Sequence, residues 1–112
     1  MNKNTLVLFT RYGMGEAPVD LQNKLGSIFL SLLNQTTPPG TLAFYGEGVK
    51  LVCEGSPVLE PLRTLAAKDV TIVICQTCLD YFGLRESVRV GTIGGMGDIV
   101  AAMSMADKVI SV

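Results

Sequence analysis

The sequence predicts a single α/β domain spanning residues 1–112, in which a mainly parallel sheet lies between helices. Segments with the pattern of strands alternate with segments that have the pattern of helices along the whole chain. The predicted strands are apolar throughout, as expected when helices cover both faces of a sheet. Hydrophobic residues make up 48% of the 112 residues, enough for a core without disulfides or metals. The order of the strands does not follow from this pattern.

The first third of the chain predicts a strand, a loop and a long helix. Residues 5–10 are a continuous apolar run, which indicates a buried strand. After the loop 11–16, Pro18 is expected to open a helix, and the segment 34–40 with its two prolines ends it. The residues expected to form the buried stripe of this helix are spaced at a period of 3.6, namely Leu21, Leu25, Ile28, Phe29, Leu32 and Leu33.

The middle of the chain predicts a second strand over 42–45, which Gly46-Glu47-Gly48 ends. We expect residues 49–52 to form a short extended piece. Ser56-Pro57 has the composition of a helix start, since serine caps and proline fits the first turn. Leu59, Leu62, Leu65 and Ala66 would be the buried side of that helix. Pro61, one turn in, predicts a kink or the true start of the regular helix.

The strongest predicted strand is 70–75, which is β-branched and fully apolar. Residues 76–83 follow as a short helical turn that Gly83 closes. We expect a weaker strand over 88–93, followed by a glycine-rich turn over 94–98. A helix over 98–105 and a last strand over 109–112 complete the prediction.

Composition excludes several kinds of chemistry. The chain has no histidine, so imidazole acid–base catalysis, serine–histidine or cysteine–histidine pairs and histidine-bound zinc are absent from it. The 9 basic and 10 acidic residues give a net charge of −1 and are scattered, so we expect no nucleic-acid partner. No apolar run is long enough to span a bilayer, and the start does not have the pattern of a signal peptide. We therefore expect a cytoplasmic protein that does not bind membranes.

Cys75-Gln76-Thr77-Cys78 is the motif with the clearest chemistry. Cys75 ends a predicted buried strand and Cys78 lies in the next turn, at the sheet edge where α/β proteins bind ligands. Amides at the start of a helix would lower the pKa of such a thiol. The alternative is that these are ordinary buried cysteines, as we expect for Cys53. Too few ligands remain for zinc, the late position disfavours a thioredoxin-type dithiol, and we expect no cofactor or metal.

Two further segments could contact an anion. The turn that contains Gly94, Gly95 and Gly97 precedes a helix, so its amides could cradle a negative group. It matches neither G-x-G-x-x-G nor the Walker pattern, and a tight turn that needs positive φ is the favoured alternative. Arg11 follows the first strand and could neutralise a thiolate or an anionic substrate. The favoured alternative for Arg11 is a solvated loop.

The motifs together resemble a known family. The runs Gly48-Val49-Lys50-Leu51, Glu54-Gly55-Ser56 and Cys75-Gln76-Thr77-Cys78-Leu79-Asp80-Tyr81 resemble the DsrE-like domain of YedF-type proteins, which are sulfurtransferase-like and associated with selenium metabolism. This resemblance implies a DsrE-like three-layer α/β/α fold with a five-stranded parallel sheet. It also implies a homo-oligomer, a trimer or a hexamer. YedF-type proteins usually carry a small sulfur-carrier domain before this one, which here would be either a separate partner protein or missing altogether.

The resemblance also implies roles for the thiols. In sulfur-relay relatives the carrier cysteine follows a strand and precedes a glycine by eight residues, which here assigns the persulfide to Cys75 and the glycine to Gly83. Cys78 would be the second, assisting thiol. Two positions depart from the family pattern: Gln76 stands where glycine is usual, and Gly95-Met96-Gly97 stands where Asn-Met-Tyr is usual.

Two functions from different classes follow from these observations. The first is a sulfur or selenium carrier, or sulfurtransferase, that passes a cysteine persulfide along a relay. The second is a non-catalytic oligomeric scaffold or small-ligand-binding module, which the scarcity of charged groups and the apolar context of Cys75 favour. Rapid alkylation of a native thiol would distinguish the first from the second, because buried cysteines are inert.

Overall fold

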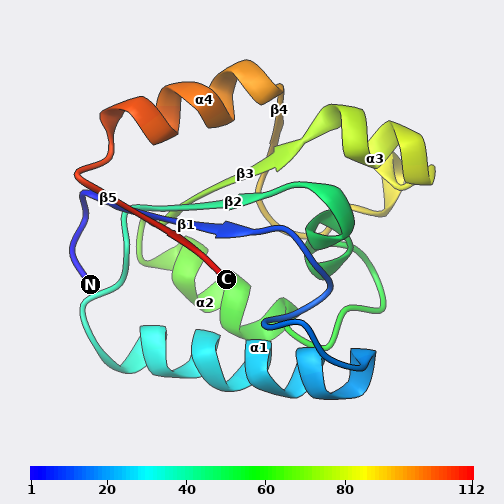
Figure 1. Cartoon of the computed structure of the whole chain (residues 1–112), viewed down its shortest axis with the longest axis horizontal. Helices are drawn as coiled ribbons and strands as arrows, with labels where there is room; N and C mark the ends of the chain where they lie inside the picture. Colours follow the sequence, from blue (N-terminus) through cyan, green and yellow to red (C-terminus); the bar gives the residue numbers. More distant parts are fainter.

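A five-stranded, all-parallel sheet forms the centre of the computed structural model, which describes residues 1–112 (Figure 1). The strands are β1 (Thr5–Phe9), β2 (Thr41–Phe44), β3 (Thr71–Cys75), β4 (Thr92–Gly94) and β5 (Lys108–Ser111). Their order across the sheet is β4-β3-β2-β1-β5, so the first and last strands of the chain are neighbours, with Thr5 opposite Lys108. The predicted α/β/α architecture is confirmed.

The strand order explains which helix covers which face. The chain moves across the sheet in one direction as it passes from β1 to β2 and then to β3. Because each of these connections is a right-handed crossover, α1 (Val19–Gln35) and α2 (Leu59–Ala67) lie on the same face of the sheet. The step from β4 to β5 runs back across the sheet, and the same rule sends α4 (Met96–Met105) to the opposite face (Figure 1). Consequently α4 alone covers that face.

The core forms because each central strand buries both of its faces. All five residues of β1 are buried, as the continuous apolar run predicts. The rings of Phe9 and Phe44 stack with centroids 5.0 Å apart, and Phe29 of α1 meets Phe9 edge-on at 6.0 Å. One contiguous cluster of 24 buried residues joins the sheet to its helices.

The predicted buried stripe of α1 is wrong in most of its members. Four of its residues are exposed, namely Leu21, Leu25, Ile28 and Leu32. The helix instead buries Gly26, Leu30 and Leu33 against the sheet. Gly26 permits a close approach, because a Cβ there would lie 3.3 Å from the Cα of Gly13. Helix α1 therefore has two apolar faces, and only one of them packs in this chain.

Helix α2 starts later than predicted and is not kinked. Ser56 does not cap it: the Ser56 Oγ accepts the Val58 amide at 3.2 Å, and Leu59 is the first helical residue. Pro61 is the third residue of the helix, where an amide has no partner within the helix, so its missing N–H costs nothing. The first bond of this helix runs from the Leu62 amide to the Val58 carbonyl, at 3.2 Å.

Three further boundaries correct the prediction. Residues 46–52 form a 3-10 helix, η1 (Gly46–Val52), rather than a break and an extended piece, because a short, mostly apolar run fits a buried helix as well as a strand. In the predicted strand 88–93 only the last residues pair, as β4, while Val88 forms an isolated bridge with Cys53. Helix α4 begins at Met96, inside the predicted turn. No helix has the length and hydropathy that crossing a bilayer requires.

Candidate functional site

The two cysteines of the CxxC motif lie at the carboxyl edge of the sheet. Cys75 is the last residue of β3, and the chain turns there from extended backbone into α3 (Gln76–Phe82). Cys78 is the third residue of that helix. Gly83 ends α3 with φ 67° and ψ 35°, a left-handed conformation that glycine adopts without strain, so the predicted helix end is confirmed.

The two thiols differ in depth. Cys75 is only 1% exposed and belongs to the core, whereas Cys78 is half-buried. The Gly46 amide, at the start of η1, donates a hydrogen bond to the Cys78 Sγ at 3.1 Å. Gly46 was not among the predicted site residues, since it lies 32 positions from Cys78 in the sequence. Only Cys78 is therefore reachable from solvent in this conformation.

The Cys78 thiol is not activated by its surroundings. Burial raises the pKa of Cys78, the Gly46 hydrogen bond opposes that rise, and a hydrogen bond and charge repulsion from Cys75 add to it. The expectation that helix amides lower this pKa is wrong, because α3 is only seven residues long and desolvation outweighs the amide contact. At neutral pH Cys78 is a protonated thiol beside a second thiol.

The glycine-rich turn is a helix start whose amide already has a partner. Gly94 pairs in register with Cys75, so the turn does lie beside the thiols. The Asp98 Oδ2, however, accepts the Gly95 amide at 2.8 Å, which places a carboxylate of this chain where an external anion would bind. Gly94, Gly95 and Gly97 have no positive φ. At Gly94 a Cβ would lie 3.0 Å from Val73 and 2.8 Å from Asp98, so close packing requires glycine there.

Arg11 has no direct contact with either thiol. It follows β1, and β2 separates β1 from β3, so the carboxyl ends of β1 and β3 are about 10 Å apart. No ion pair or hydrogen bond joins the Arg11 guanidinium to Cys75 or Cys78. Arg11 is half-buried in the loop after β1, and its role stays a prediction.

A shallow hollow of about 360 Å³ lies next to α3, between the loop after β1 and η1. Phe82, one helical turn after Cys78, lines it, and the Lys50 Nζ lies 4.6 Å from the centroid of the Phe82 ring. Cys53 lines the same hollow, but its side chain is buried and its thiol donates to the Val49 carbonyl at 3.2 Å. Burial raises the pKa of Cys53, and the charge of Arg89 opposes the rise. Cys53 is thus a packing residue, as predicted.

The structure has no cluster of side chains that could bind a metal ion. No three cysteine, aspartate or glutamate side chains gather closely enough to hold an ion. All three cysteines are free thiols. The chemistry available at this edge of the sheet is therefore that of a neighbouring pair of thiols.

The fold is that of a small α/β protein with an all-parallel five-stranded sheet, and two thiols lie where β3 ends and α3 begins. The chain belongs to the DsrE/DsrF-like family, whose model matches residues 14–112. The crystal structure of the YchN protein from E. coli is similar, with a TM-score of 0.69 and 18% identity over 96% of this chain and 98% of that chain.

Two proteins of unknown function have the same fold. MTH1491 from Methanobacterium thermoautotrophicum has a TM-score of 0.66 and 18% identity, over 96% of this chain and 98% of that one. BT1422 from Bacteroides thetaiotaomicron has a TM-score of 0.66 and 17% identity, over 97% of this chain and 95% of that one. No curated protein matches the sequence. At these identities the likeness establishes the fold alone.

Proposed function

We propose that this protein is a sulfur or selenium carrier that passes a cysteine persulfide along a relay. The observation that supports this best is the pair Cys75 and Cys78, two thiols in mutual contact at the carboxyl edge of the sheet, one half-buried and one buried. Membership of the DsrE/DsrF-like family supports the same class of function. Cys78 meets the donor and Cys75 stores the sulfur.

The transfer balances without an oxidant or a reductant. The Cys78 thiolate attacks the outer sulfur of a donor persulfide, the S–S bond of the donor breaks, and the departing donor thiolate takes up the proton that Cys78 lost. Cys75 then attacks the outer sulfur of the Cys78 persulfide in the same way, and Cys78 returns to a thiol. A sulfur held on Cys75 is shielded from solvent, because that side chain is 1% exposed.

The surroundings of Cys78 offer a contact surface for a partner, which we propose to be a small sulfur-carrier protein. Tyr81, three residues after Cys78, is 84% exposed and packs edge-on against Phe82 with centroids 5.2 Å apart. Exposed aromatic side chains are frequent anchors at protein interfaces. Lys50 lies over the Phe82 ring and is paired with Glu47, so the two add polar groups to the edge of this surface without a net charge.

Loading with a low-molecular-weight persulfide tests the proposal by intact-mass measurement. The wild-type chain is expected to gain one sulfur, and Cys78→Ser none, because the only reachable thiol is gone. Cys75→Ser is expected to gain one sulfur that cyanide removes faster than from the wild type, since it then stays on the half-buried Cys78. Cys53→Ser is the matched control and should load normally. A wild-type chain that gains no sulfur would end the proposal.

We also propose that the chain forms a homo-oligomer, for which the resemblance implies three or six copies. The supporting observation is the outward face of α1, where Leu21, Leu25, Ile28 and Leu32 are exposed. Their spacings of four, three and four residues form a continuous apolar seam of the kind that pairs helices. Every copy offers the same seam, so α1 helices of neighbouring copies can pack against one another along it.

Ile28→Glu is expected to reduce the molecular mass in light scattering toward the 11.9 kDa of one chain. A charge on the seam must be desolvated on association but stays hydrated in the monomer, so stability of the single chain should barely change. Ala67→Glu, on the exposed end of α2, is the control. Equal masses for the wild type and Ile28→Glu would contradict the assignment of this face.

A further inference from the structure

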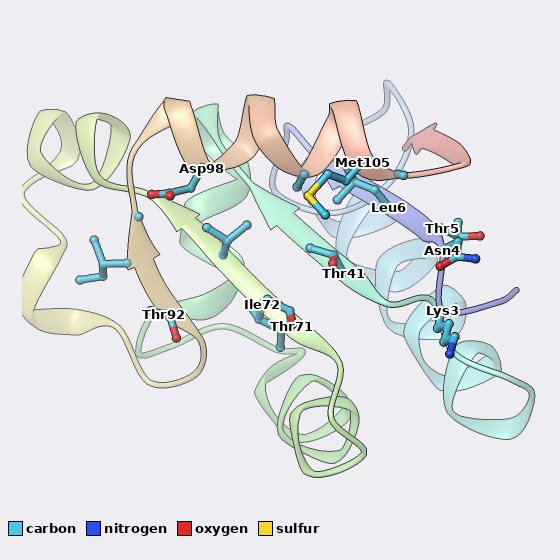
Figure 2. Close-up of a pocket in the computed structure, with 15 residues that line it drawn as sticks. Lys3, Asn4, Thr5, Leu6, Thr41, Thr71, Ile72, Thr92, Asp98 and Met105 are labelled. Atoms are coloured by element: carbon cyan, nitrogen blue, oxygen red, sulfur yellow. The ribbon is translucent and has the colours of Figure 1, made fainter.

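Another cavity lies on the sheet face that α4 covers alone, mainly along the amino ends of the strands. It has a volume of about 600 Å³ and is bounded by the strands β1 to β4 and one side of α4 (Figure 2). No cysteine lines it. Pockets of this size hold small organic molecules in many proteins.

The floor of the cavity carries hydroxyl groups on an apolar surface. Thr41 and Thr71 are opposite each other on β2 and β3, and Thr92 of β4 is opposite Val73, so these side chains share one face of the sheet. None of the three threonine hydroxyls forms a hydrogen bond within the chain, whereas other threonine hydroxyls, such as those of Thr5 and Thr64, do. The floor therefore offers three free hydrogen-bonding groups.

The wall of the cavity is made by small and flexible residues of α4. Ala102, and Ala106 directly after the helix, leave space between α4 and the strands, and Met105 at the rim is 83% exposed. A thioether side chain adapts to the shape of what it covers. We call the space between the sheet and these small side chains the slot, and we expect it to accept a planar molecule more readily than a bulky one.

Charges mark the two ends of the slot. Asp98 lies at the end near β4, and Lys3 lies at the opposite end, before β1 (Figure 2). Neither forms an ion pair in the chain, and the two charges cancel. The slot therefore has no net charge that would attract an anion or a cation, and we expect its ligand to be uncharged.

We propose that this slot binds a planar, mostly apolar, uncharged small molecule with hydroxyl, carbonyl or amide substituents that pair with Thr41, Thr71 and Thr92. This binding is separate from the sulfur chemistry, because the slot contains neither thiol. A chain that fails to load sulfur can still bind at the slot, and the reverse also holds.

The test uses 2-naphthol and 2-naphthamide as planar, uncharged probes and dodecanoate as a flexible anion, with amide chemical shifts as the readout. We expect the two planar probes to cause saturable shifts, confined to α4 and to the first residues of β1, β2, β3 and β4. We expect dodecanoate to cause none. The double variant Thr41→Val with Thr71→Val should weaken binding about tenfold through two lost hydrogen bonds. Ala102→Leu should abolish it by filling the slot, and Thr64→Val, on the exposed side of α2, is the control.

Three results would overturn the proposal. The first is the absence of saturable shifts at the slot for both planar probes. The second is binding that Ala102→Leu leaves unchanged, since the probe would then occupy another site. The third is a change of molecular mass in light scattering for Ala102→Leu at unaltered thermal stability, because the occupant would then be a second copy of the chain.

Discussion

Gly48→Ala is expected to destabilise the protein by about 3 kcal/mol, a large effect for a single methyl group. A Cβ at Gly48 would lie 2.1 Å from the Phe9 carbonyl oxygen and 2.7 Å from its carbon. Both atoms are backbone of the first strand, so no side chain can turn aside to relieve the overlap. Because a domain of this size has a stability of about 5–15 kcal/mol, much of it would be lost.

Urea denaturation followed by circular dichroism measures this effect, and Gly97→Ala is the matched control. Gly97 lies in α4, and no atom lies within 4 Å of the place that a methyl group would occupy there. Alanine at this position should therefore stabilise the helix by up to about 1 kcal/mol. The two glycine substitutions thus have opposite expected signs. Equal midpoints for the two variants would show that η1 does not need its close approach to β1.

Iodoacetamide is expected to modify Cys78 in the native protein and to leave Cys75 and Cys53 unmodified. Cys78 is half-buried, whereas the other two thiols are buried and become accessible only when the structure opens. We expect the native rates of Cys78 and Cys75 to differ by at least about a hundredfold, since opening of the core is rare. Peptide mapping after short exposure measures both, and full denaturation should equalise them.

The pH dependence of this reaction tests the raised pKa of Cys78. Because thiolate is the nucleophile, the rate should keep rising with pH beyond the point where a free cysteine levels off. The free energy of unfolding should fall over the same alkaline range, because the unfolded chain releases a proton that the folded chain retains. A rate that levels off at or below neutral pH would mean that Cys78 is activated.

The sequence predicted correctly those helices and strands that short stretches of neighbouring residues determine. The continuous apolar runs of β1 and β3 leave few alternatives, and Gly83 marks the end of α3 by a conformation that glycine favours. The run 49–52 failed, because periodicity does not separate a short buried helix from a strand. The α1 stripe failed for another reason: a helix with two apolar faces carries more apolar positions than one core needs, and Leu30 belonged to the buried face.

The place of the two cysteines in the fold could be predicted from the sequence, but the residues that surround them could not. A cysteine that ends an apolar strand must reach the carboxyl edge of a parallel sheet, so the placement of Cys75 and Cys78 follows from the pattern. The contact of Gly46 with Cys78 joins segments far apart in the chain and depends on the strand order, which the sequence does not reveal. The burial that raises the pKa of Cys78 depends on the same unpredicted packing.

The neighbouring positions of β1 and β5 affect how the chain folds during synthesis. Thr5 pairs with Lys108, so one edge of β1 stays unpaired until Lys108 has left the ribosome. Pairing across so many residues carries a large loop-closure cost and forms late. Until then β1, whose five residues are all buried in the folded state, presents an open apolar edge to other chains. We therefore expect a chain truncated before β5 to aggregate instead of folding as a smaller domain.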